Sequence, residues 1–62
     1  MTALEVLIKE ADEKVAQLKD FLSEGKATSY EDYQRLCGEI RGLLIMRGRT
    51  LDLKDQLEKS DE

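Results

Sequence analysis

The sequence predicts an all-α protein, an antiparallel hairpin of two helices. Two observations predict this fold. The 62 residues contain no proline, and apolar residues recur at the helical period on both sides of one short polar segment, residues 23–29. So short a connection places two helices side by side in opposite directions. A chain of this length forms one domain at most, so we expect a single helical-hairpin domain over residues 1–62.

The first helix is expected over residues 3–23. Thr2 and Glu5 stand three residues apart in the pattern of a capping box, which predicts a helix that begins at residue 3. The apolar residues that follow are spaced alternately by four and three positions, as in a heptad repeat, and should face the second helix: Leu4, Ile8, Ala11, Val15, Leu18 and Leu22. A turn over residues 24–29 should follow, with Gly25 in the left-handed conformation.

The second helix is expected over residues 30–58, followed by a frayed tail at 59–62. Ser29 is the expected N-cap, with Asp32 completing an imperfect capping box, and Thr28 with Glu31 is the competing cap. One apolar face in the first half of this helix should pack on the first helix: Tyr33, Leu36, Cys37, Ile40, Leu43 and Leu44.

The apolar pattern changes after residue 45. Met46, Leu53 and Leu57 share a face rotated by about 100° from the earlier one. Leu51 stays on the earlier face, and Ile45 belongs to neither. Because one interior glycine costs only about 1 kcal/mol, we expect the helix to continue through Gly48, with a kink there or a new short helix capped by Thr50 as alternatives. Since the second helix is longer, about two of its turns should extend beyond the first helix and carry Leu51, Leu53 and Leu57.

Composition limits the function. The net charge is -4, which does not favour nucleic-acid binding. With one cysteine and no histidine, the chain has no disulfide of its own and no histidine-based catalytic site. The apolar runs are too short to cross a membrane, and the N-terminal residues lack the features of a signal peptide, so we expect an intracellular protein. A two-helix hairpin offers no pocket for paired carboxylates, so we expect no enzyme, no cofactor, no metal and no small-molecule substrate.

A partner chain is the expected source of stability, because so short a chain buries only about 60% of its unfolded surface. Gly38 and Gly42 form a Gly-x-x-x-Gly pair, and each costs about 1 kcal/mol in a helix interior relative to alanine. Close approach of a second chain would offset that cost. The candidate partner-binding residues are Gly38, Gly42, Ile45, Met46, Leu51, Leu53 and Leu57.

The segment around the turn also suggests a family. Residues 23–27 read Ser-Glu-Gly-Lys-Ala, and residues 29–43 read Ser-Tyr-Glu-Asp-Tyr-Gln-Arg-Leu-Cys-Gly-Glu-Ile-Arg-Gly-Leu. Residues 15–45 resemble small helical-hairpin proteins encoded among the head and tail genes of tailed bacteriophages. The resemblance implies a structural protein of the virion or the bacterial host cytoplasm that binds a larger virion protein or itself as an oligomer. The alternative is a small regulator or inhibitor that binds one host or phage enzyme through the same surface.

Overall fold

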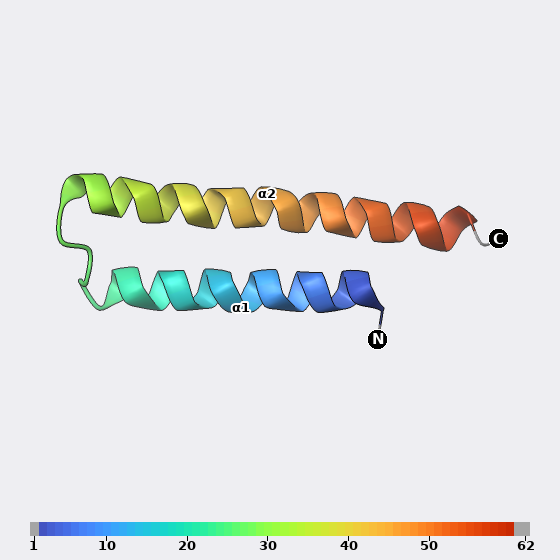
Figure 1. Ribbon diagram of the computed structural model, residues 1–62, viewed down its shortest axis with the longest axis horizontal. Helices are drawn as coiled ribbons and strands as arrows, with labels where there is room; N and C mark the ends of the chain where they lie inside the picture. Colours follow the sequence, from blue (N-terminus) through green and yellow to red (C-terminus); the bar gives the residue numbers. More distant parts are fainter. Residues whose placement is uncertain (1, 61–62) are drawn as a thin grey trace.

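The structure is a computed structural model that describes residues 2–60. It contains two α-helices, α1 (Ala3–Ser23) and α2 (Tyr30–Ser60), which lie antiparallel and in contact along their length (Figure 1). The prediction of an all-α helical hairpin is confirmed. The molecule is long and narrow, with extents of 50 × 18 × 12 Å, because two helices form a single layer with one shared contact.

Local hydrogen bonds explain where α1 begins and ends. Thr2 Oγ1 accepts a hydrogen bond from the Glu5 N–H at 3.2 Å, which satisfies one of the free amides of the first turn. At the other end, Gly25 has a φ of 72°, in the left-handed region that favours glycine. Its N–H donates to the Leu22 carbonyl at 3.0 Å, and the Lys26 N–H donates to the Phe21 carbonyl at 3.4 Å. These two bonds form a Schellman motif that ends the helix.

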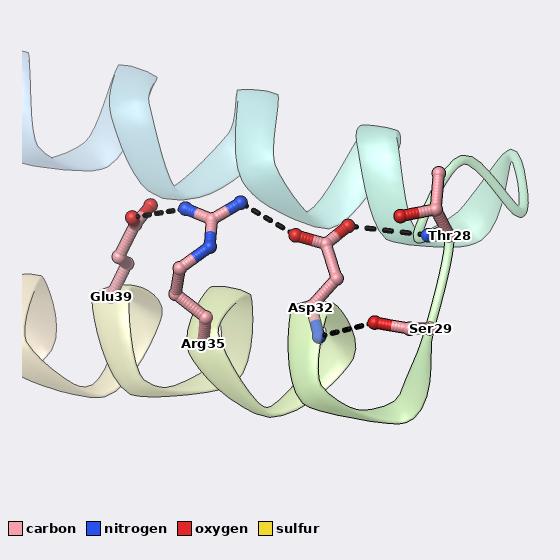
Figure 2. A network of polar contacts seen from close by, with 5 residues as sticks. All are labelled: Thr28, Ser29, Asp32, Arg35 and Glu39. Carbon is pink, nitrogen blue, oxygen red and sulfur yellow. Dashed lines mark hydrogen bonds and ion pairs between the residues drawn. The ribbon is translucent and has the colours of Figure 1, made fainter.

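The start of α2 is held by a reciprocal pair of hydrogen bonds (Figure 2). Ser29 Oγ accepts from the Asp32 N–H at 3.0 Å, so Ser29 is the N-cap, and the competing cap at Thr28 is not used in this role. The Asp32 carboxylate accepts from the Thr28 N–H at 3.2 Å. On its other side it pairs with Arg35 at 2.7 Å, and Arg35 also reaches Glu39 at 2.8 Å. The cap therefore continues into a charged network along the first turns of α2.

Helix α2 is continuous through Gly48 and ends at Ser60, two residues beyond the predicted end. Residues 59 and 60 are thus helical, whereas residues 61–62 of the predicted tail lie outside the described residues. The Thr50 hydroxyl donates to the Met46 carbonyl at 2.8 Å, one turn back along the same helix. Thr50 therefore lies inside α2 and does not cap a separate helix.

The core is small. Among residues 2–60, Val15, Leu18 and Leu36 are the buried apolar residues, with exposed fractions of 4–9%. All six α1 residues predicted to face the second helix are buried or half-buried. On α2 the prediction was wrong at two positions, because Tyr33 and Leu44 are 48% and 47% exposed. They lie at the edge of the contact, where the α2 surface curves away from α1.

Candidate functional site

The contact between the helices changes from apolar to polar along α2. We name the facing residues of both helices the seam. On α1 the seam consists of Leu4, Ile8, Ala11, Val15, Leu18 and Leu22. On α2 it consists of Leu36, Ile40, Leu43, Arg47, Thr50 and Lys54, all buried or half-buried and spaced alternately by four and three residues. Hydrophobicity does not predict the last three residues, which are polar and share only the spacing of the others.

In the described part of the chain, two ion pairs cross the polar half of the seam. The Arg47 guanidinium donates to both carboxylate oxygens of Asp12, through Nε to Oδ1 and through Nη2 to Oδ2, the second at 3.5 Å. Nearer the N-terminus of α1, Lys54 Nζ lies 3.9 Å from Glu5 and 2.9 Å from Glu58. The pKa of Lys54 is raised, chiefly by its hydrogen bond with Glu58 and less by the charge of Glu5. In the sequence, Arg47 and Lys54 continue the alternating four- and three-residue spacing of the apolar seam residues, and the first helix carries acids that can pair with them. These two features together indicate the polar half of the seam.

Because polar residues of α2 face α1 in this half of the seam, the apolar residues in the second half of α2 lie on its other sides. A helix with 3.6 residues per turn presents only one row of side chains to its neighbour. Met46 is 60% exposed, Leu53 47% and Leu57 51%. These three residues are separated by seven and four positions and therefore share one side of α2. The second half of α2 thus exposes the kind of apolar row that a helix normally buries.

An open groove runs between the helices on the side of Met46. We name it the groove. Its two adjoining hollows are lined by Leu7, Glu10, Ala11, Lys14, Leu18, Glu39, Gly42, Leu43, Met46, Arg47 and Thr50. Ala11 contributes only a methyl group to the seam, which leaves space between α1 and α2 at this level. The expectation of a hairpin without any pocket is therefore corrected, although the groove is shallow and open to solvent.

The structure brings together only some of the predicted partner-binding residues. Gly42 and Met46 line the groove, and Leu53 lies on the same side of α2. Leu57 borders a separate hollow that also includes Thr2, Ala3, Leu4, Lys54 and Glu58. Three others lie off the groove: Gly38, Ile45 and Leu51 are exposed elsewhere on α2. Ile45 is rotated by about 180° from Leu36 and so points away from α1.

The extent of α2 beyond α1 is smaller than expected. Lys54 faces Glu5, and Leu57 lies beside the first turn of α1. Leu51 and Leu53 therefore lie alongside α1 and not beyond it. Only the C-terminal end of α2 projects past the start of α1 (Figure 1).

The glycine pair has free space on its surface. A Cβ atom added at Gly38 or Gly42 would meet nothing within 4 Å. No close approach within the hairpin therefore requires either glycine. Of the two, only Gly42 borders the groove.

The opposite edge of the hairpin carries a second polar and aromatic cluster. Cys37 is a half-buried free thiol, one helical turn after Tyr33. Interaction with this thiol is the main cause of the raised pKa of Tyr33. Leu44 and Leu51 follow on the same side of α2 at intervals of seven residues.

Comparisons with protein-family models, with curated proteins and with solved structures find no significant match. Neither α1 nor α2, over residues 2–60, has the length and apolar character to cross a membrane. Within the same described residues, no group of three or more side chains suited to binding a metal ion lies together.

Proposed function

We propose that this chain is a small, non-enzymatic interaction protein with a structural role, which acts by burying the groove and its apolar rim against another protein chain, either a larger protein or a second copy of itself. One observation carries the proposal. Within residues 2–60, eleven large apolar residues are exposed and three apolar residues are buried. Isolated exposed apolar residues are common on soluble proteins, but two of the eleven, Leu7 and Met46, face each other across one groove, and apolar residues grouped in this way are typical of an interaction surface.

The arrangement of the two helices supports this surface as the site. Leu7 projects from α1 and Met46 from α2, and the two side chains line the same hollow with exposed fractions of 51% and 60%. Leu53, two turns after Met46, extends the apolar rim along α2. Covering such side chains is worth about 25 cal/mol per Å² of apolar surface. A partner would therefore supply the stability that a core of three buried residues does not.

The resemblance of residues 15–45 to hairpin proteins from the head and tail genes of tailed phages supports a place in the virion. A virion offers many identical copies of a larger protein, so one small surface can be bound repeatedly in a ring or shell. In this proposal the hairpin is a component of such an assembly. The polar seam fixes which residues of α2 face outward to meet the assembly.

Cosedimentation tests the proposal. A tagged copy of the chain is produced in bacterial cells in which the phage particles assemble. The particles are then purified on a density gradient. The wild-type chain and Ile45→Glu should sediment with intact particles, because Ile45 lies away from the groove. Met46→Glu should remain at the top of the gradient, because it places a charge in the groove. Wild-type chain that is free of particles and of every other protein would contradict the proposal, and wild-type chain bound to one soluble enzyme would favour a regulator.

A further inference from the structure

We propose that the occupant of the groove is a second copy of this chain, packed groove against groove about a two-fold axis into a four-helix assembly. This inference rests on the proposed function, because it uses the same surface and names its partner. Three properties of the described residues support it. They are the exposed area of the chain, the balance of charges around the groove, and the shape of the groove floor.

The chain exposes more surface than a compact monomer of its mass, and the excess is close to the area that one partner buries in an interface. The chain exposes 4949 Å², whereas a compact monomer of its mass would expose about 4100 Å². The excess is about 850 Å², close to the roughly 800 Å² that each partner buries in an interface of standard size. The radius of gyration, 14.8 Å, likewise exceeds the value of about 10.6 Å for a compact chain of this length. Stacking two flat hairpins groove against groove would bury apolar surface of this kind and make the assembly thicker than a single layer of two helices.

The groove carries both acidic and basic residues, so the charges on one copy can pair with those on a second copy. A two-fold interface uses the same patch twice, so the patch must contain both partners of each contact. Glu10 and Glu39 provide two acids, and Lys14 and Arg47 provide two bases. If α1 stacks on α1, Lys14 can meet Glu10 of the partner subunit, and if α1 stacks on α2, it can meet Glu39 of the partner subunit. A partner surface of one dominant charge would oppose half of these groups.

Two of these groups have no ion-pair partner within the part of the chain that the structure describes. Among the ion pairs formed within residues 2–60, Glu39 pairs with Arg35 and Arg47 pairs with Asp12, but Glu10 and Lys14 take part in none. Glu10 and Lys14 are therefore available for contacts between copies. Such contacts at the rim would select the orientation of the second copy more than they would add affinity.

The shape of the groove also suits a second copy. Met46 projects beside Ala11 and Gly42, two positions with little or no side chain. Nothing lies within 4 Å of a Cβ added at Gly42, so a neighbouring side chain has room there. In a two-fold pair, Met46 of each copy can occupy the space above Gly42 of the other. This is the knob-into-hole arrangement by which helices of four-helix bundles pack.

Sedimentation equilibrium of the purified full chain, from low micromolar to near-millimolar concentration, tests the inference. The wild-type chain should show a reversible monomer–dimer equilibrium. Met46→Glu should raise the dissociation constant by about tenfold or more, since it buries a charge in a central contact. The matched control is Ile45→Glu, a neighbouring residue of similar exposure that lies off the groove, and it should change the constant by less than about twofold. Leu7→Glu repeats the test from α1, and circular dichroism confirms that each variant is helical.

Three results would overturn the inference: a wild-type chain that stays monomeric at every concentration, a dimer that Met46→Glu and Leu7→Glu do not weaken, or a dimer that Ile45→Glu weakens equally. The proposed function is tested separately by cosedimentation. A monomeric chain that sediments with particles in a Met46-dependent manner would overturn self-association and support binding to a different protein. A monomeric chain that binds no particle and no protein would overturn both.

Discussion

Arg47, near the middle of α2, donates hydrogen bonds from its guanidinium to both carboxylate oxygens of Asp12 on α1. The pair lies at a position of the seam where a coiled-coil contact normally has an apolar residue. Arg47 and the polar residues that follow it, Thr50 and Lys54, occupy the row of α2 that faces α1. Met46 and Leu53 therefore lie on a neighbouring side of α2, where they form the exposed apolar rim of the groove.

The Asp12–Arg47 pair should contribute little to stability despite its geometry. Its side chains are 51% and 35% exposed, and exposed ion pairs are worth about 0–1 kcal/mol because water screens them. A double-mutant cycle with Asp12→Ala and Arg47→Ala, measured by urea unfolding, should give a coupling free energy of about 0.5 kcal/mol. A coupling of several kcal/mol would show that this contact, and not the apolar seam, holds the hairpin together.

The apolar half of the seam should dominate the free energy of unfolding. Leu36 is 4% exposed, so Leu36→Ala should destabilise the hairpin by about 2–4 kcal/mol. Leu44, two turns further along α2 and 47% exposed, is the matched control, and Leu44→Ala should change stability by less than about 0.5 kcal/mol. Thermal melts followed by circular dichroism measure both. Equal losses in the two variants would mean that α2 is rotated relative to the seam described above.

The same substitution should have opposite effects at two glycines. Gly25 has a φ of 72°, which an alanine adopts only with strain, so Gly25→Ala should destabilise the chain by about 1 kcal/mol. Gly48 lies inside α2 with nothing within 4 Å of an added Cβ. Gly48→Ala should therefore stabilise the chain by about 0.5–1 kcal/mol. A loss of stability from Gly48→Ala would indicate that α2 bends there in solution.

The network at the start of α2 predicts a dependence on pH. The pKa of Asp32 is lowered from 3.8, chiefly by the hydrogen bond from Arg35 and then by that from the Thr28 N–H. A carboxyl with a lower pKa in the folded chain adds stability that is fully present above 3.8 and is lost as the pH falls through the lower folded value. Asp32→Asn should thus lower the melting temperature at neutral pH and reduce its fall in acid.

Arg35→Gln provides the control for that experiment. It removes the larger cause of the lowered Asp32 pKa and keeps the Thr28 contact, so its acid dependence should lie between those of the wild type and Asp32→Asn. If Asp32→Asn retained the full acid dependence of the wild type, other carboxylates would be responsible.

Most of the fold could be predicted from the sequence because its signals are local. Thr2, Ser29 and Gly25 form caps whose geometry depends on residues within one turn, and the six apolar residues of α1 follow a regular heptad spacing. The outward position of Tyr33 and Leu44 could not be predicted from hydrophobicity alone. Their positions on the α2 wheel lie close to those of Leu36 and Ile40, and only the rotation of α2 against α1 decides which of them are covered.

The site was harder to predict than the fold. Hydrophobicity identified Met46, Leu53 and Leu57 as residues that need a partner, and the structure places all three on one exposed side of α2. Hydrophobicity did not identify Leu7 as the opposite wall of a groove or Ala11 as its floor. Both roles depend on which part of α1 faces Met46. Nor did it identify Arg47, Thr50 and Lys54 as seam residues, since polar residues in a helix contact are recognised by their spacing and by acids on the facing helix.

Solvent accessibility of the Met46 methyl group most directly tests the claim that the groove is an interaction surface. The chain contains two methionines and three isoleucines, so labelling the methyl groups of both residue types gives a simple spectrum, and a soluble paramagnetic probe reports the exposure of each methyl group. In a dilute solution of the chain, the probe should cause rapid relaxation of the methyl groups of both Met46 and Ile45. At high concentration, or on assembled particles, Met46 should become protected while Ile45 remains accessible. Equal accessibility of both methyl groups under all of these conditions would contradict the account.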